Sequence, residues 1–262
     1  MSILDEIFAS KRLEVEAAQK QRPLVEVRRM AESAAAALPF AGALRRPSLQ
    51  APLRLIAEVK CASPSRGLLA AHFDPIQLAT IYQQNGAAAI SVLTDARYFK
   101  GALLYLEQIA ALQPRLPLLR KDFIYDPYQV YEGRASGADA ILLIAAYLDL
   151  QQLADLHALV CALGMDALVE VHNGDELEQA LTVSPTLVGI NNRDLHDFKV
   201  DLDTCLRLRA SIPSSVTVVA ESGIHSAADV SRLAAAGMDA MLVGEALVTA
   251  ADTALKIRSL LP

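Results

Sequence analysis

The chain has 262 residues, of which 53% are hydrophobic and 21% are charged. This is the composition of a globular protein, and the length suits one large domain better than two independent ones. The formal net charge at pH 7 is −6, and the sequence holds no long run of Lys or Arg. Both observations argue against a nucleic-acid-binding surface and against a polybasic membrane anchor.

Membrane insertion and secretion are also disfavoured. The longest strongly apolar run, 141–148, is far shorter than the roughly 18 residues that a membrane-spanning helix needs. The N-terminus lacks the basic start and apolar core of a signal peptide. The cysteines are odd in number and show no CxxC spacing, which favours buried or free thiols in a reducing compartment. We therefore expect a cytoplasmic protein with no membrane or nucleic-acid partner.

The first 50 residues differ in pattern from the remainder. Residues 3–18 predict one helix, and Pro23 is followed by a second helical stretch that we expect to run through Ala37. We expect residues 1–50 to be an N-terminal helical extension packed on the rest of the chain.

Eight short apolar segments follow, each of which predicts a strand. They lie at Leu53–Lys60, Ala88–Thr94, Leu116–Phe123, Ala138–Ala145, Ala167–His172, Leu187–Asn192, Thr217–Ser222 and Ala240–Gly244. They are apolar at both alternating positions, as in parallel strands covered on both faces. Helical stretches separate them, and two of these begin with an acidic N-cap followed by proline, at Asp74-Pro75 and Asp126-Pro127.

An internal repeat links strands to helices. Gly86, Gly137, Gly164 and Gly237 each stand in a small-residue turn that leads into an apolar strand. Their intervals of 51, 27 and 73 residues are close to two, one and three units of about 25 residues, the size of one strand plus one helix. The chain 1–262 is therefore predicted to be a single α/β domain, a (β/α)₈ TIM barrel. An open doubly wound sheet is the structural alternative.

Charged and polar side chains interrupt the strands near their C-terminal ends. Residues two apart share a face of a strand. This rule pairs Glu58 with Lys60, Lys121 with Phe123, Glu170 with His172, Asn191 with Arg193, and Glu221 with Gly223. Because barrel enzymes carry their chemistry at the C-terminal ends of the strands, three acids and three cations are expected to converge at one mouth. A purely structural salt-bridge network is the competing interpretation.

The loops after the last two strands predict a phosphate site. Ser222-Gly223 and Gly244-Glu245 follow these strands, and glycine lets backbone N–H groups approach a phosphate closely. Glu245 would then have to turn its carboxylate away from the phosphate. The loop 61–67 is polar, ends at a glycine and is long enough to act as a lid. We found no metal-ligand spacing and no nucleotide-binding glycine motif, so we expect no metal.

At these residues the chain resembles the indole-3-glycerol-phosphate synthase family of tryptophan biosynthesis. The resemblance covers nearly the whole chain, in the stretches IAEVKCASPSRG (56–67), LRKDFIYDPYQVYE (119–132), LVEVHNGDEL (168–177), VGINNRDL (188–195), VAESGI (219–224) and LVGEAL (242–247). It implies a carboxy-lyase that closes a ring and releases CO₂ and water. The substrate would be 1-(2-carboxyphenylamino)-1-deoxyribulose 5-phosphate, and no cofactor is implied.

The resemblance also implies roles for single residues. Lys121 is the acid that protonates the substrate carbonyl, Glu170 is the base for dehydration, and Lys60 meets the substrate carboxylate. Which lysine acts at which step stays open. Support of the substrate and the lysines is assigned to Glu58, Asn191, Arg193 and Glu221; contact with the ligand is assigned to Ser63, Ser222, Gly223, Gly244 and Glu245; and the aromatic wall is assigned to Phe99 and Phe123. A lysine that donates a proton works best when its pKa is lowered toward neutral, and a glutamate that accepts a proton benefits from a raised pKa.

The sequence departs from the family pattern at three positions. Cys61 replaces a basic residue, Lys100 replaces a smaller one and Ala102 replaces a serine. Two other functions remain possible: the isomerase of the preceding step, which would want a Cys and Asp pair, and a non-catalytic barrel, which would lack a central lysine or glutamate. We expect a monomer or a weak homo-oligomer.

Overall fold

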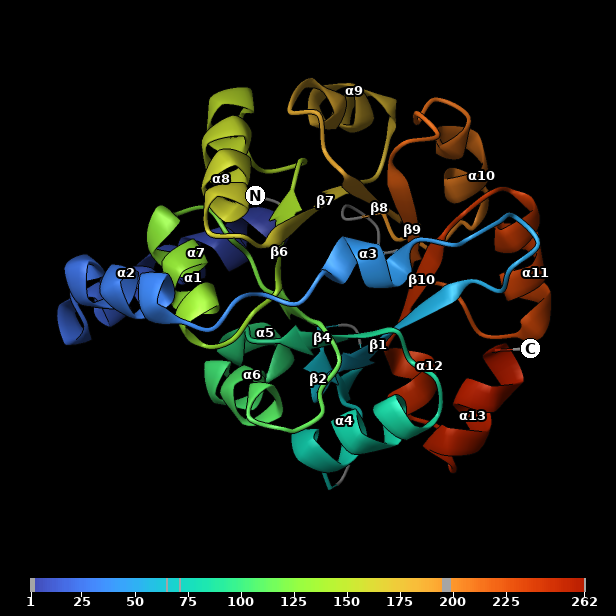
Figure 1. Ribbon diagram of the computed structural model, residues 1–262, viewed down its shortest axis with the longest axis horizontal. Helices are drawn as coiled ribbons and strands as arrows, with labels where there is room; N and C mark the ends of the chain where they lie inside the picture. Colours follow the sequence, from blue (N-terminus) through green and yellow to red (C-terminus); the bar gives the residue numbers. More distant parts are fainter. Residues whose placement is uncertain (1–2, 65, 71, 195–198, 262) are drawn as a thin grey trace.

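A closed barrel of eight parallel strands forms the centre of the molecule (Figure 1). The computed structural model describes residues 3–64, 66–70, 72–194 and 199–261. The barrel strands are β1 (Arg54–Val59), β4 (Ala89–Leu93), β5 (Leu118–Lys121), β6 (Ala140–Ile144), β7 (Asp166–Val171), β8 (Leu187–Asn191), β9 (Thr217–Glu221) and β10 (Ala240–Val243). Because β1 pairs with both β4 and β10, the sheet closes. The predicted TIM barrel is confirmed, and the open-sheet alternative is excluded.

Helices connect the strands and surround the barrel (Figure 1). They are α4 (Pro75–Gln84), α5 (Ala96–Phe99), α6 (Leu103–Ala110), α7 (Pro127–Ala135), α8 (Leu150–Ala162), α9 (Gly174–Thr182), α10 (Asp203–Arg209), α11 (Ala227–Ala235), α12 (Glu245–Val248) and α13 (Thr253–Leu260). Asp74 and Asp126 cap α4 and α7 as predicted, since each carboxylate accepts hydrogen bonds from backbone N–H groups of the first turn. The four repeat glycines all have positive φ, between 74° and 93°, the conformation that glycine adopts without strain.

The loop after β1 contains a small hairpin that the sequence did not predict. Its strands are β2 (Ala62–Ser63) and β3 (Gly67–Leu68), which pair antiparallel. This is the segment expected to act as a lid.

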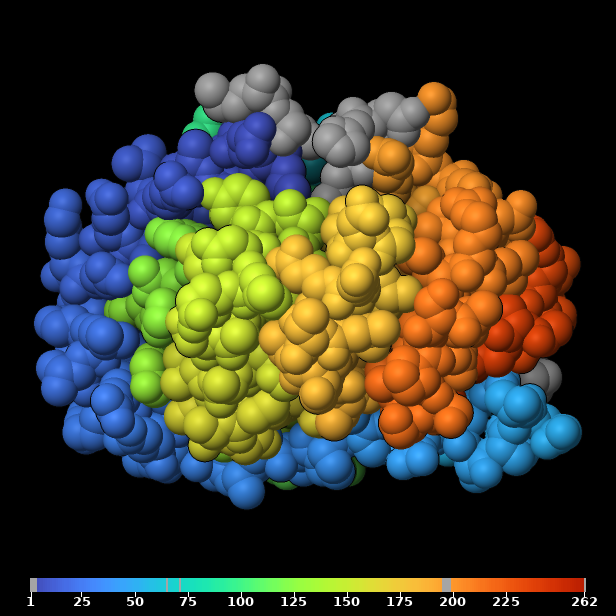
Figure 2. All heavy atoms as spheres, turned by 90° about the horizontal axis from the view of Figure 1, so that it is seen from above, coloured from blue at the N-terminus to red at the C-terminus, as the bar shows by residue number. Residues whose placement is uncertain are grey.

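The N-terminal extension wraps the barrel from one end to the other (Figure 2). It comprises α1 (Ile3–Gln21), α2 (Leu24–Ser33) and α3 (Phe40–Leu44). The prediction that the second helix runs through Ala37 is wrong, because Ala34 has an extended backbone that ends α2 at Ser33. The chain then crosses to the N-terminal end of the barrel. There α3 places two fully buried side chains, Phe40 and Leu44, in the barrel interior.

The barrel interior changes from apolar to charged along the strands. One buried cluster contains Phe40 together with Ile56, Leu119, Leu168, Leu187 and Val219. Two residues further along the same strands stand Glu58, Lys121, Glu170, Gly189 and Glu221. The period of two that positions the apolar core therefore also positions the charged groups just above it. The four charged residues come from alternate strands of the barrel, as the members of one interior layer do.

Candidate active site

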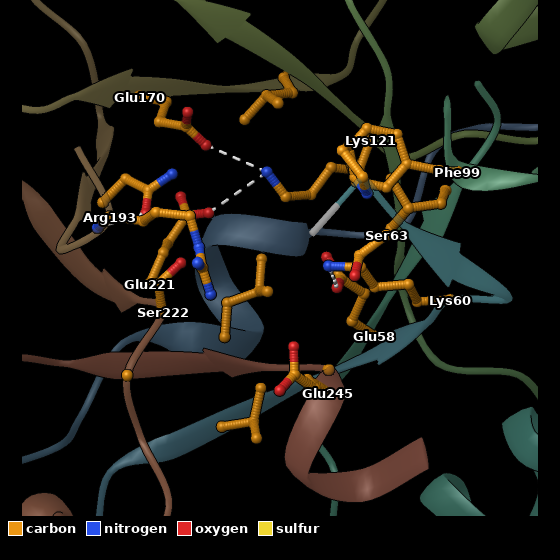
Figure 3. A pocket seen from close by; sticks show the side chains of 18 of the residues that line it. Glu58, Lys60, Ser63, Phe99, Lys121, Glu170, Arg193, Glu221, Ser222 and Glu245 are labelled. Carbon is orange, nitrogen blue, oxygen red and sulfur yellow. Dashed lines mark hydrogen bonds and ion pairs between the residues drawn. The ribbon is translucent and has the colours of Figure 1, made fainter. Parts of the chain in front are cut away.

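Lys121 lies at the centre of the charged layer (Figure 3). Its Nζ is 3.0 Å from Oε2 of Glu170 and 3.4 Å from Oε2 of Glu221, so that the lysine bridges two carboxylates from β7 and β9. Lys60 forms a separate pair with Glu58, at 3.3 Å between Nζ and Oε1. The three carboxylates are almost completely buried, whereas both lysines keep some exposure toward the mouth.

The charges of this layer shift the pKa of its members, and two directions differ from the prediction. Burial works to lower the pKa of Lys121, but the carboxylates of Glu170, Glu221 and Glu58 outweigh it and raise that pKa. Burial works to raise the pKa of Glu170, but Lys121 and His172 outweigh it and lower that pKa. The expected lowering of the lysine pKa and raising of the Glu170 pKa are therefore wrong. The cause is that Lys121 lies between acids and not beside a cation.

Glu221 is the carboxyl group whose pKa rises, to about 8. Burial is the main cause; Lys121 opposes it, and Glu170 and Glu58 add to it. A group with a higher pKa in the folded protein binds more protons folded than unfolded. Its contribution to stability is complete below the unfolded pKa, near 4.5, and is lost as the pH rises through about 8.

Glu221→Gln is accordingly expected to weaken the fall in Tm that accompanies a rise from about pH 5 to about pH 8. Thermal unfolding of both proteins across this range measures the effect, with Glu178→Gln on the exposed face of α9 as the control. Parallel Tm profiles for wild type and Glu221→Gln would contradict it.

Two aromatic rings form one wall of the site. The rings of Phe99 and Phe123 lie 6.0 Å apart, and Lys60 Nζ is 5.4 Å from the centroid of Phe99. From α1, Phe8 packs edge-on against Phe123 at 5.5 Å. The N-terminal helix also lines the cavity itself, with Leu4 and Ile7. The sequence pattern did not reveal these contributions, because nothing local to α1 indicates which end of the barrel it covers.

A buried lysine of α1 fastens the loops that carry these groups. Lys11 is only 2% exposed, and its Nζ lies 2.9 Å from Oδ1 of Asp122 and 3.0 Å from Oδ2 of Asp95. Asp122 follows Lys121 directly, and its Oδ1 also accepts a hydrogen bond from the N–H of Phe123. Asp95 caps α5 by accepting the N–H groups of Tyr98 and Phe99. Lys11 thus joins the extension to the loops after β4 and β5.

On the opposite side of the mouth, the turns after β9 and β10 line the cavity. Ser222 and Gly223 have positive φ, 66° and 78°, and a Cβ at Gly223 would meet Val200 at 2.4 Å. Glu245 accepts a hydrogen bond from Arg66 at 2.6 Å, so its carboxylate is neutralised by the loop after β1. Ser63 lies on that same loop, and its buried Oγ makes no hydrogen bond among the described residues.

Two glycines leave space for the carboxylates. A Cβ at Gly189 would stand 2.2 Å from Oε1 of Glu221, and a Cβ at Gly244 would stand 2.2 Å from Oε1 of Glu58. Any side chain at either position would displace a charged group of the layer. Gly244 was expected for its closeness to phosphate, whereas Gly189 was missed. The alternation that placed Asn191 in the cavity could have found it, since the two share a face of β8.

One cavity brings together every predicted site residue. Its lining includes Glu58, Lys60, Ser63, Phe99, Lys121, Phe123, Glu170, Asn191, Arg193, Glu221, Ser222, Gly223, Gly244 and Glu245. Asn191 accepts a hydrogen bond from the N–H of Arg193 and so shapes the turn after β8. His172, which the alternation places on the same face as Glu170, lines a neighbouring polar hollow.

Within the described residues, no three His, Cys, Asp or Glu side chains are arranged to hold a metal ion. In the same residues, no helix has the length and apolarity to cross a membrane.

These features define a (β/α)₈-barrel enzyme with acid–base groups gathered at the C-terminal mouth. The sequence model described as indole-3-glycerol phosphate synthase matches residues 4–260. The chain belongs to the indole-3-glycerol phosphate synthase family.

Curated relatives agree with this assignment. The indole-3-glycerol phosphate synthase of Roseiflexus castenholzii is 53% identical over 99% of this chain and 98% of its own length. That of Chlorobium chlorochromatii is 49% identical over 94% of this chain and 95% of its own. Among solved structures, a 3-hexulose-6-phosphate synthase aligns with a TM-score of 0.64 at 15% identity, covering 79% of this chain and 98% of that one. This last similarity concerns the fold alone.

Proposed function

We propose that this chain catalyses the synthesis of indole-3-glycerol phosphate, a step of tryptophan biosynthesis. The reaction converts 1-(2-carboxyphenylamino)-1-deoxyribulose 5-phosphate into the product, CO₂ and water, which makes the chain a carboxy-lyase. The observation that carries the proposal is Lys121, held between Glu170 and Glu221 in the interior layer. Membership of the family supports it over the whole length of the barrel.

The two sides of the cavity suit the two ends of this substrate. The carboxyphenyl ring would lie against Phe99 and Phe123, with Lys60 beside the ring to meet its carboxylate. The phosphate would lie across the mouth, near Ser63 and the turns at Ser222-Gly223 and Gly244-Glu245. Arg193 lines the cavity too and would add positive charge for the anionic substrate.

Proton transfer would occur between these two ends. Lys121 is held as an ammonium by its carboxylates, so it enters the reaction with a proton to give to the substrate carbonyl oxygen as the ring closes. When CO₂ leaves, the electron pair of the broken carbon–carbon bond returns to the ring. In the dehydration that completes the indole, the hydroxyl formed at ring closure would leave as water with a proton from a lysine ammonium. Glu170, kept ionised, would accept the proton that the ring loses. Glu58, Asn191 and Glu221 would hold the lysines and the turn after β8 in place.

The two competing functions find less support. The isomerase reaction would want a cysteine and an aspartate acting together, but none of the three cysteines is among the residues described as lining the cavity. Asp122 does line it, yet its carboxylate is held by Lys11 and Arg120. A non-catalytic barrel would lack a central acid or base, and Lys60, Lys121 and Glu170 all stand in place.

We also propose the setting in which the chain works. It would act as one domain, residues 1–262, with 1–50 as an extension that completes the substrate cavity. It would be cytoplasmic, in keeping with its free cysteines, and would act without cofactor or metal as a monomer or weak homo-oligomer.

A fluorescence assay tests the proposed function. The chain contains no Trp, so its own emission comes from tyrosine and leaves the indole signal clear. Purified protein mixed with the carboxyphenylamino substrate is expected to develop indole fluorescence, and Glu170→Gln is expected to lower kcat by roughly 100-fold. Glu178→Gln, exposed on α9, is the matched control and should keep the wild-type rate. Absence of indole formation by the wild type would refute the proposal.

A further inference from the structure

A chain of alternating charges leads from the surface of the barrel to Glu170. Glu176, in the first turn of α9, places Oε2 2.9 Å from Nδ1 of His172. The Nε2 atom of the same ring lies 3.4 Å from Oε1 of Glu170. The other oxygen of Glu170, Oε2, accepts the hydrogen bond of Lys121. Each oxygen of Glu170 thus faces its own cation, one from the loop after β7 and one from β5.

Several contacts determine the orientation of the imidazole. Oε2 of Glu176 also accepts the backbone N–H of His172, and Oε1 accepts a hydrogen bond from the Asn173 amide at 2.6 Å. Nε2 of His172 is buried and makes no hydrogen bond among the described residues, so the acidic oxygen of Glu170 is the group that it faces. Because Glu176 anchors the opposite nitrogen, the ring is aimed at Glu170 by α9.

Other charged groups surround this chain at its two ends. Glu170 is also faced by Glu221 from β9, whose carboxylate contacts the same Lys121 ammonium. The polar hollow beside His172 and Glu176 is lined by the charged residues Asp5, Asp194, Lys199, Asp201 and Arg207. These come from α1 and from the segments that follow β8, and both signs of charge are present among them.

We propose that His172 and Glu176 are positioning residues for the base. Glu176 holds the His172 ring, and the ring, as an imidazolium, orients Glu170 and keeps it ionised with one oxygen directed at the reaction centre. The inference rests on the proposed function and adds to it a second source of control over Glu170, outside the cavity that holds the substrate.

The electrostatics of the pair agree with this geometry. Burial works against a charged His172, but Glu170 and Glu176 outweigh it and raise the pKa of the imidazole to about 10. The same ring contributes to the lowered pKa of Glu170, after Lys121. A neutral side chain at position 172 would remove one of the two charges that keep Glu170 a carboxylate.

The pH dependence of activity tests the positioning role. The change His172→Gln leaves a hydrogen-bond donor at this position, the side-chain amide, but it removes the positive charge of the imidazolium. Glu170 should therefore become protonated at a higher pH. The ratio of variant to wild-type kcat/KM is expected to stay constant near neutral pH and to fall only at acid pH, by up to roughly tenfold for a shift of one pKa unit, as the pH drops through the pKa of Glu170 in the variant. A merely structural role would lower the ratio equally at every pH. His157→Gln on α8, which is not among the residues that line the cavity, is the control and should give a ratio near one throughout.

A spectroscopic measurement tests the charge itself without any assay of turnover. Nitrogen NMR of protein labelled at its five histidines, with His172→Gln used for assignment, reports the protonation of each ring. His172 is expected to be an imidazolium at about pH 8, and Glu176→Gln is expected to move its titration to lower pH, whereas Glu178→Gln is not.

The outcomes separate the two proposals. A wild type that forms no indole refutes the proposed function and with it the positioning role. A wild type that forms indole but has a neutral His172 at pH 8, or a His172→Gln ratio that does not change with pH, overturns the inference alone.

Discussion

Replacing Lys121 with Met is expected to lower kcat for indole formation by roughly 100-fold or more. Methionine nearly matches the length of lysine but has no proton to donate to the substrate carbonyl. It also leaves Glu170 and Glu221, both almost fully buried, without the cation that lies between them. Lys121 is also the group that lowers the pKa of Glu170 most, so without it Glu170 would be protonated more readily and would be weaker as a base. The loss therefore combines a missing acid with a disabled base.

The measurement is the rate of indole fluorescence at saturating substrate, with circular dichroism to establish that the variant is folded. Lys20→Met is the matched control, because Lys20 is exposed in the last turn of α1 and lies away from the cavity. A folded Lys121→Met protein with a rate within about threefold of wild type would refute the assignment of Lys121 as the acid.

Replacing Lys11 with Met is expected to destabilise the protein by about 3–5 kcal/mol, the effect of removing one partner from a buried ionic network. Lys11 neutralises Asp95 and Asp122, both of which remain buried when the ammonium is lost. Arg120 still faces Asp122, whereas among the described residues the Asp95 carboxylate keeps only the backbone N–H donors of α5. The loops after β4 and β5 should loosen together, so KM is also expected to rise through displacement of Phe99 and Phe123.

Denaturant unfolding at pH 7 measures the change in free energy, and Lys20→Met again serves as the control on the same helix. Lys11→Arg retains the charge and should recover part of the stability. A change of less than about 1 kcal/mol in Lys11→Met would show that the network contributes little to the fold.

The strands were predictable because their signal is local. Each strand is a short apolar run, and four of the runs follow a glycine turn. Because both faces of the sheet are covered, the apolar residues are continuous along each strand. The end of α2 was not predictable in the same way. Residues 34–37 are alanines, which have a good helical propensity. The helix nevertheless ends before them, because the chain must cross to α3 at the N-terminal end of the barrel.

The members of the site were predictable, but their partners were not. Counting by two from the apolar core places Glu58, Lys121, Glu170 and Glu221 on inward faces near the strand ends. The pairs that form depend on which strands face each other across the barrel, and β5, β7 and β9 are not adjacent in the sheet. The directions of the pKa shifts follow from those pairs, which is why the expectation for Lys121 and Glu170 was reversed.

The sequence by itself determined the barrel, the end of the barrel at which the candidate site lies and the residues that reach that end. All three follow from short-range periodicity along each strand. Only the tertiary structure decided that Lys11 of the extension fastens the loops after β4 and β5, that Gly189 makes room for Glu221, and that Glu176 of α9 holds the His172 ring. These contacts join residues distant in the chain or depend on side-chain direction. Both are determined by barrel closure and by the packing of α1 and α9, and neither leaves a periodic trace in the sequence.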